Sequence, residues 1–244
     1  MAANSIEQRL VEHENHRLVP KRKTEYHAAF VSAMSLKLSH NNLKDDAKGI
    51  NTMLRSKLPS DLNTSVVVGK WYVPFIFVKE RDAKVQIKRS TYYSMTLRKS
   101  WEEVYSCGKV DYNEEHGEGE GEVEVDVEVE SELVKLEGQV IQKETRGVDE
   151  NGVAWFEIAG RKIGLRSMVV EKMKSEEERF GWSKETDDIK SSIKRSHRFE
   201  GTAMLWQSYK CYVLVETFEL KRMDGSLVLT YEFRHADMLK TKWD

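Results

Sequence analysis

The spacing of apolar residues along the chain changes from a helical period to a period of two after Pro59. Over residues 43–58 the apolar positions recur at steps of three and four, which places these residues on one helix face: Leu43, Ala47, Ile50, Met53, Leu54 and Leu58. Asn42 has the chemistry of an N-cap, and Pro59 that of a helix end. The pattern therefore predicts a helix over residues 43–58.

Two β-rich segments follow, SVVVGKWYVPFIFVKE at residues 65–80 and a second stretch at residues 91–107. Gly69 and Pro74 in the first segment predict a bend, a bulge or an edge position, because the interior of a strand accommodates neither residue easily. In the second segment one face is apolar, with Tyr93, Met95 and Leu97. Both segments are predicted to contain strands.

The second half of the chain alternates turn signals with apolar strands. After a polar, glycine-rich stretch at residues 108–122, valines recur at every second position and predict a strand that continues to Leu136. Glu137-Gly138 and Asp224-Gly225 predict tight turns between strands. Two further elements are predicted, a strand at residues 153–160 and a helix at residues 167–180.

Together these patterns predict an α+β fold, mainly antiparallel β-sheet with a few covering helices. Four segments are expected: residues 1–42 as a divergent N-terminal helical segment, 43–107 as a helix with aromatic-rich strands, 108–122 as an acidic glycine-rich loop, and 123–244 as β-hairpins with one helix. Residues 43–244 are also compatible with one domain, since a chain of 244 residues can bury one large core or two modest ones.

Charge is distributed unevenly, although the net charge is only −2. Residues 1–110 carry 19 Lys and Arg against 11 Asp and Glu, whereas residues 111–132 carry 11 acids and no basic residue. This asymmetry predicts attraction between the two parts, or to different partners. The low net charge does not favour nucleic acid as a partner.

The cysteines and the apolar runs indicate the compartment. Cys107 and Cys211 are far apart in the sequence and predict neither a disulfide framework nor a zinc site. No apolar run reaches the length of a membrane span, and the N-terminus lacks the apolar core of a secretory signal. We therefore expect a cytoplasmic or nuclear protein with reduced thiols and no membrane partner.

The most unusual stretch is EVEVDVEVE at residues 122–130, in which acids and valines alternate. In a strand the acids share one face: Glu122, Glu124, Asp126, Glu128 and Glu130. Three interpretations remain open: a solvated face, a docking surface for a basic partner or for the chain's own basic half, and a weak divalent-ion site. A straight row of carboxylates diverges, whereas Ca²⁺ needs about six to eight converging oxygens, so no metal site is assigned. The basic segment IKRSHRF at residues 193–199 is the expected electrostatic partner within the chain.

Other candidate sites are weaker. Residues 71–77 contain four aromatic side chains that suit either core packing or a small-molecule pocket: Trp71, Tyr72, Phe75 and Phe77. His13 and His16 have metal-ligand spacing but no further ligand nearby. GEGEGE lacks the lysine and hydroxyl residue of a phosphate loop, and neither GxSxG nor HExxH occurs. The sequence thus assigns no catalytic residue and no cofactor.

Several long phrases of the sequence resemble one protein family. These phrases are LKDDAKGINTMLRSKLPSDLNTSVVVGKWYVPFIFVKE, YYSMTL, WEEVYSC, VVEKMKSEEERFGW and KCYVLVETFELKRMDGSLVLTYEFRH. They resemble the plant proteins grouped as domain of unknown function 1262, over residues 43–244. The resemblance implies a plant source, but no established activity, cofactor or catalytic residue. Family members have a further N-terminal region that residues 1–42 do not resemble, which implies a truncated, diverged or mis-spliced member.

We expect a non-enzymatic binding or interaction module with an unknown protein partner. The alternatives are an enzyme or small-ligand binder whose site the sequence does not reveal, and an incomplete paralogue without independent function. If the sheet lacks a strand, TSVVVGKWYVPFIFV at residues 64–78 favours self-association, because it is apolar and its only charge is Lys70.

Overall fold

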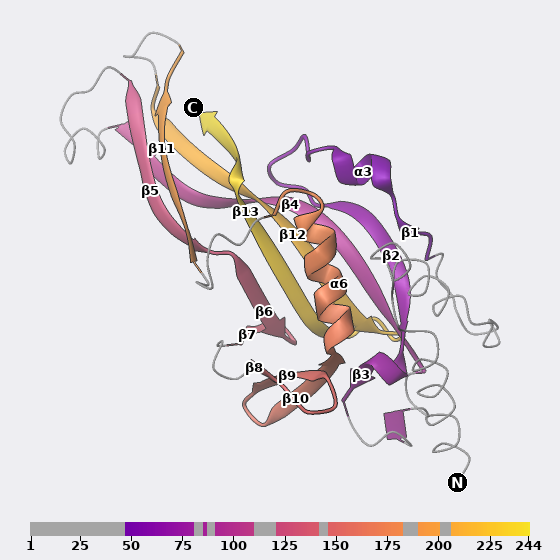
Figure 1. Ribbon diagram of the computed structural model, residues 1–244. Helices are drawn as coiled ribbons and strands as arrows, with labels where there is room; N and C mark the ends of the chain where they lie inside the picture. Colours follow the sequence, from indigo (N-terminus) through magenta and orange to yellow (C-terminus); the bar gives the residue numbers. More distant parts are fainter. Residues whose placement is uncertain are drawn as a thin grey trace.

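The computed structural model describes residues 47–80, 85–86, 91–109, 121–141, 146–182, 190–200 and 206–244. The expectations for residues 1–42, including His13 and His16, and for most of the loop at 108–122 lie outside these residues. The described residues form three antiparallel sheets and two α-helices (Figure 1).

The largest sheet has seven strands in the order β1-β2-β4-β12-β13-β6-β7. Their bounds are Gly49–Ile50 (β1), Val66–Pro74 (β2), Tyr92–Gly108 (β4), Glu132–Leu136 (β6), Gln139–Val140 (β7), Ser208–Arg222 (β12) and Leu227–Trp243 (β13). Strands β4, β12 and β13 contain 17, 15 and 17 residues and form the long central part of the molecule (Figure 1).

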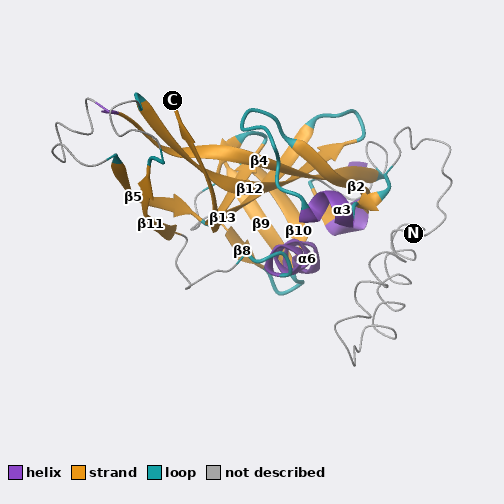
Figure 2. Cartoon of the chain, turned by 90° about the horizontal axis from the view of Figure 1, so that it is seen from above, coloured by secondary structure: helices purple, strands orange, loops and turns teal. Residues whose placement is uncertain are grey.

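Two smaller sheets and the helices pack on these long strands. The four-stranded sheet has the order β3-β10-β9-β8, with Val78–Lys79 (β3), Arg146–Val148 (β8), Val153–Ile158 (β9) and Arg161–Arg166 (β10). Strands β5 (Glu122–Glu130) and β11 (Lys190–Arg198) form a two-stranded sheet that we call the ribbon. Helices α3 (Thr52–Ser56) and α6 (Ser167–Glu178) lie on the same side of the long sheet (Figure 2).

The long strands contribute to separate cores. Because side chains in a strand alternate, Phe218 and Leu220 lie on one face of β12, and Cys211 and Val213 lie on the other. The first face joins a core that α6 and the four-stranded sheet complete with Ala154, Phe156, Ile163, Leu165, Val169 and Met173. The second face joins a core that the ribbon completes with Val123, Val125, Val129 and Ile193.

The predicted fold class is confirmed, because antiparallel sheets dominate the described residues and only two α-helices accompany them. The helix predicted at 167–180 is α6. The two predicted turns are also confirmed: Gly138 and Gly225 have φ of 88° and 89°, a left-handed conformation that glycine adopts without strain. Within the described part of the chain, neither helix has the length and apolar composition needed to span a bilayer.

The helix predicted at 43–58 is wrong in its extent. Gly49 has a φ of 79°, which a right-handed helix does not accommodate, and Gly49–Ile50 instead pairs with β2 as strand β1. Helix α3 begins only after Asn51, whose Oδ1 accepts hydrogen bonds from the backbone N–H groups of Met53 and Leu54. The predicted apolar face is not the buried one, since Met53 is 71% exposed while the buried residue of α3 is Arg55.

The single strand predicted from residue 123 to Leu136 is also wrong, because it breaks at Ser131. Strand β5 pairs with β11, whereas β6 pairs with β13 in the largest sheet. The Ser131 carbonyl, which accepts a hydrogen bond from the Arg234 N–H, marks the point where the chain changes sheets.

The bulge predicted around Gly69 is confirmed as a register shift between Val67 and Gly69 in the pairing of β2 with β4. A Cβ at Gly69 would lie 2.8 Å from the Gly49 carbonyl oxygen, so glycine permits the close approach of β1. Strand β2 pairs with β4 along most of its length and with β1 on its other side, while Val67 is 42% exposed. Self-association through residues 64–78 stays a prediction.

Candidate functional site

The ribbon brings the acidic strand and a basic strand into register. Asp126 lies opposite Lys194, and Lys194 Nζ is 2.9 Å from Asp126 Oδ2. Lys190 Nζ lies 3.1 Å from Glu128 Oε2. The hydrogen bond with Asp126 raises the pKa of Lys194. The predicted pairing of the acidic strand with the chain's own basic segment is therefore confirmed.

The two faces of the ribbon have different chemistry. All five acids of β5 are exposed, whereas Val123 and Val125 are 0% and 1% exposed, as the alternation predicts. Opposite the acids, β11 presents three cations and two serines: Lys190, Ser192, Lys194, Ser196 and Arg198. The outer face thus carries an excess of two acids that the ribbon itself does not neutralise.

A second group of charges is buried under α6. We call it the charge cluster; it contains Arg55 of α3, Lys99 of β4, Glu177 of α6, Glu216 of β12 and His235 of β13. The side chains are at most 4% exposed. Five elements from four separate parts of the sequence, with β12 and β13 as consecutive strands, therefore meet at one polar centre within an otherwise apolar interface.

Arg55 holds the charge cluster together. Its Nη2 lies 2.7 Å from Glu177 Oε1, and its Nη1 lies 2.6 Å from Glu216 Oε2. Lys99 Nζ is 3.0 Å from Glu216 Oε1 and also donates to the Arg55 carbonyl. The Phe180 ring lies 4.1 Å from Arg55 Cζ and packs on the guanidinium.

Burial shifts the pKa values of the two glutamates and of the histidine in opposite directions. Burial raises the pKa of Glu177, and burial together with the negative charge of Glu177 raises the pKa of Glu216 to about 7. Burial lowers the pKa of His235 to about 4, so His235 is neutral at physiological pH. Its Nε2 lies 3.1 Å from Glu177 Oε2.

The charge cluster contains three residues that could bind a metal, since ligand atoms of Glu177, Glu216 and His235 lie within 4.8 Å of one another. Both carboxylates, however, already contact cationic side chains. A metal ion at this position would have to displace Arg55 and Lys99 from the carboxylates that neutralise them. The arrangement therefore fits a buried ion-pair network better than a metal centre.

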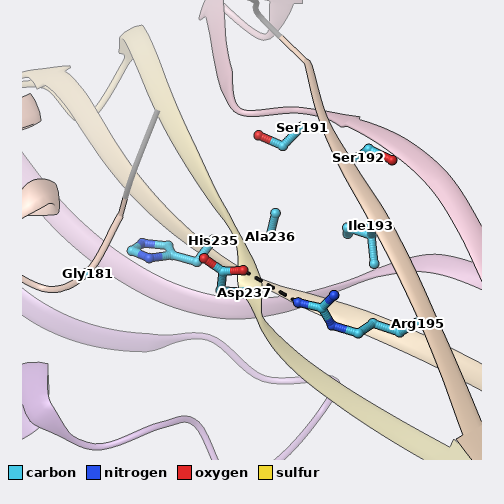
Figure 3. A pocket seen from close by; sticks show the side chains of 8 residues that line it. All are labelled: Gly181, Ser191, Ser192, Ile193, Arg195, His235, Ala236 and Asp237. Atoms are coloured by element: carbon cyan, nitrogen blue, oxygen red, sulfur yellow. Dashed lines mark ion pairs between the residues drawn. The ribbon is translucent and has the colours of Figure 1, made fainter. Parts of the chain in front are cut away.

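A pocket of about 90 Å³ lies beside the charge cluster (Figure 3). It is lined by Gly181, Ser191, Ser192, Ile193, Arg195, His235, Ala236 and Asp237. His235 belongs to both features: its Nε2 contacts Glu177, whereas its buried Nδ1 has no hydrogen-bond partner among the described residues. Arg195 Nη2 and Asp237 Oδ1 form a loose ion pair of 3.7 Å at this pocket.

A bulge in β13 shapes the pocket wall. Leu239 pairs with Val213, but the adjacent Leu214 pairs with His235, so β13 contains three residues without a partner in β12: Ala236, Asp237 and Met238. Bulges redirect side chains away from the regular pleat and occur often beside functional sites. Here Ala236 and Asp237 line the pocket together with residues of β11.

The four aromatic residues considered as a pocket do not converge. Trp71 and Tyr72 are consecutive in β2 and point to opposite faces. Trp71 packs edge-on against Phe218, with the ring centroids 6.2 Å apart, and Phe77 is buried in the same core. Tyr72 instead contacts Tyr92. Phe75 also packs against the core, so three of the four contribute to core packing.

The charge cluster was not predicted from the sequence, although one signal of it was present. Lys99 continues the apolar stripe of Tyr93, Met95 and Leu97 in β4, and Glu216 continues that of Phe218 and Leu220 in β12. A charge in phase with a buried stripe indicates a buried ion pair. The partners Arg55 and Glu177 are 122 residues apart, however, and no local pattern connects them.

No family model matches the chain, and no curated protein matches it. Among solved structures, the crystal structure of Cry35Ab1 is similar with a TM-score of 0.38 and 14% sequence identity, over 77% of this chain and 50% of that chain. The chain thus spans about half the length of that structure.

Proposed function

We propose that the protein is a non-enzymatic binding module whose ribbon docks a basic segment of a protein partner. The observation that carries this proposal is the outer face of the ribbon, where five exposed acids stand against three cations. The valines opposite fix this face on the core, so the acids are presented on a rigid strand. Excess charge on a rigid face favours a partner of opposite charge.

The buried charges support a binding role rather than catalysis. A catalytic acid or base must reach its substrate, but Glu177 and Glu216 are at most 1% exposed and already contact Arg55. Burial raises the pKa of both carboxyl groups, and the negative charge of Glu177 adds to the effect at Glu216. The similarity of residues 43–244 to the plant family, and a cytoplasmic or nuclear location, stay predictions.

Calorimetric titration of the full chain with a lysine- and arginine-rich decapeptide tests the proposal. We expect binding that weakens as salt increases, because charge pairs at a surface are screened. The combined substitution Glu124→Gln, Asp126→Asn and Glu128→Gln should weaken binding about tenfold, since three exposed ion pairs of about 0.5 kcal/mol each sum to about the 1.4 kcal/mol of a tenfold change.

The matched control is the combination Glu157→Gln, Glu171→Gln and Glu178→Gln, which removes the same number of exposed acids away from the ribbon. These changes should leave the affinity within about twofold of the wild type. Equal losses of peptide affinity in the two triple variants would show that only the net charge of the protein attracts the peptide. Absence of peptide binding at low salt would leave the ribbon as a solvated face and overturn the proposal.

A further inference from the structure

Strand β5 lies at an edge of the ribbon and pairs with another strand on one side only. Among the described residues its strand partner is β11, from the pair of Glu122 with Arg198 to the pair of Glu130 with Lys190. The edge of a sheet presents a row of backbone N–H and C=O groups with which a further strand can pair. In β5 this row extends over nine residues, and no register shift interrupts the strand.

The pairing with β11 determines which backbone groups point to the free edge of β5. The Phe199 N–H donates to the Gly121 carbonyl at 2.8 Å, so these two opposite residues form a hydrogen-bonded pair. In an antiparallel ladder such pairs alternate with non-hydrogen-bonded pairs. The valines of β5 therefore exchange backbone hydrogen bonds with β11, whereas Asp126 and Glu128 lie in the other pairs and direct their N–H and C=O groups to the free edge.

The residues that direct their backbone to the free edge are also the residues with acidic side chains. Asp126 thus presents a backbone donor, a backbone acceptor and an exposed carboxylate at one position of the edge. An incoming antiparallel strand would place the residue that bonds to Asp126 directly opposite it and on the same face. Lysine or arginine suits that position best, as Lys194 does on the β11 side, where its Nζ is 2.9 Å from Asp126 Oδ2.

Strand β11 shows within the chain which kind of strand β5 accepts. Lys190, Lys194 and Arg198 lie opposite acids, while Ile193 is buried with the valines in the core beneath the ribbon. The three cations of β11 face five acids, so the outer face still favours a cationic neighbour on the free edge. A second copy of β5 does not fit there, because it would place acids opposite acids.

We propose that the free edge of β5 takes up an extended segment of a partner protein in which basic residues alternate with apolar ones, so that the segment continues the ribbon as a third strand. This inference deepens the proposed docking role of the ribbon and rests on it. Backbone hydrogen bonds to the edge supply affinity, and the alternate side chains supply specificity, as in other complexes formed by strand addition. The basic residues lie beside the acids, and the apolar residues lie on the side of Val123 and Val125.

Peptides of matched composition separate strand addition from simple charge attraction. The first peptide has the nine-residue length of β5, with lysine at every second position and valine or threonine between the lysines. The second contains the same residues with all lysines in one block, which places about half of them on the wrong face of a strand. We expect the alternating peptide to bind the full chain about tenfold more tightly than the block peptide, measured by calorimetric titration in one low-salt buffer.

Methylation of the peptide backbone tests the hydrogen bonds directly. Methyl groups on the lysine nitrogens of the backbone remove the donors that face β5, whereas methyl groups on the valine and threonine nitrogens remove donors that face away from it. Both methylated peptides keep the charge and the side chains of the alternating peptide. The first should bind about tenfold more weakly than the unmodified peptide, and the second should stay within about threefold of it.

Hydrogen exchange of the ¹⁵N-labelled full chain locates the bound peptide. The backbone amides of Asp126 and Glu128 should exchange about tenfold more slowly when the alternating peptide is bound, because they then donate to it. The amides of Val125 and Val127 already donate to β11 and should change little.

The possible results distinguish this inference from the proposed function. If the block peptide or the lysine-methylated peptide binds as tightly as the alternating peptide, strand addition is overturned while docking of a basic segment stands. If no basic peptide binds, both are overturned. If the amides of Asp126 and Glu128 become protected as the concentration of the protein alone rises, a second copy of the chain occupies the edge, and the assignment to a partner protein is wrong.

Discussion

The ribbon and the charge cluster are built from the same chemical groups in opposite environments. In the ribbon, Lys194 and Asp126 lie 2.9 Å apart with side chains 70% and 64% exposed. In the charge cluster, Arg55 and Glu177 lie 2.7 Å apart with side chains 0% exposed. The distances are nearly equal, so the energetic difference between the two pairs comes from water.

Exposed charges remain solvated whether or not they are paired, and their pairing contributes little to stability. Buried charges have lost that solvation, and each depends on the others to offset the loss. The ribbon is therefore free to exchange its internal partners for those of another molecule. The charge cluster, in contrast, fixes α3 and α6 to the long sheet.

The largest effect is expected from Arg55→Met. This substitution keeps much of the side-chain volume but leaves Glu177 and Glu216 without their shared cation, which should lower the free energy of unfolding by about 3–5 kcal/mol. Urea denaturation followed by circular dichroism measures it. Arg98→Met is the control, because Arg98 also pairs with a glutamate, Glu219 at 3.2 Å, but is 32% exposed. Arg98→Met should lower the free energy of unfolding by less than about 1 kcal/mol. An equal loss of stability in the two variants would contradict the distinction between buried and exposed ion pairs.

The next effect concerns pH, and the signs of the contributions of Glu216 and His235 are opposite. The folded protein raises the pKa of Glu216 from 4.5 to about 7, so it binds a proton more readily than the unfolded chain. Its contribution to stability is present below pH 4.5 and is lost as the pH rises through 7. The pKa of His235 falls from 6.5 to about 4, so its contribution is present above pH 6.5 and is lost as the pH falls through 4.

Each contribution is about 3 kcal/mol from the size of the pKa shift, and the opposite pH dependences of the two largely cancel between pH 4.5 and 6.5 in the wild type. His235→Gln should unmask the carboxyl contribution. Relative to the wild type, its stability should decrease as the pH rises from 4.5 to 6.5. Glu216→Gln should show the opposite difference, with stability decreasing as the pH falls from 6.5 to 4. Denaturation midpoints measured at four pH values give the slope of stability against pH for the wild type and the two variants. Parallel pH profiles for all three proteins would disprove the opposite contributions of Glu216 and His235.

The comparison also shows which parts of the structure the sequence predicts. The two faces of β5 follow from the strict alternation of acids and valines. A strand with one buried face can place only the valines inside and the acids outside. The turns at Gly138 and Gly225 follow from local backbone chemistry. In each case the decisive interaction is between residues close in the sequence.

The charge cluster and the pocket depend instead on tertiary contacts. Arg55 lies in a segment with a helical apolar period, but Gly49 and the pairing of β1 with β2 turn a different side of it inward. The β13 bulge is set by the pairing of His235 with Leu214, which the residues of β13 alone do not specify. Sequence patterns therefore located the exposed charges and missed the buried ones.

The smallest effect is expected at the outer face of the ribbon. The combined substitution Glu124→Gln, Asp126→Asn and Glu128→Gln should change the free energy of unfolding by less than about 1 kcal/mol, because the exposed pairs it removes contribute little. Removal of the acids also relieves repulsion between neighbours about 7 Å apart on the same face, roughly 0.6 kcal/mol per pair in water before screening by salt.

Val125→Ala, on the inner face of the same strand, is the sharpest comparison. Val125 is 1% exposed, and loss of its two methyl groups should cost about 2 kcal/mol, more than three charge changes on the outer face. Thermal and urea unfolding of the two variants under one buffer condition provide the measurement. If the triple variant loses several kcal/mol, the acids stabilise the fold through their contacts with β11, and the ribbon is then not free to exchange them for a partner.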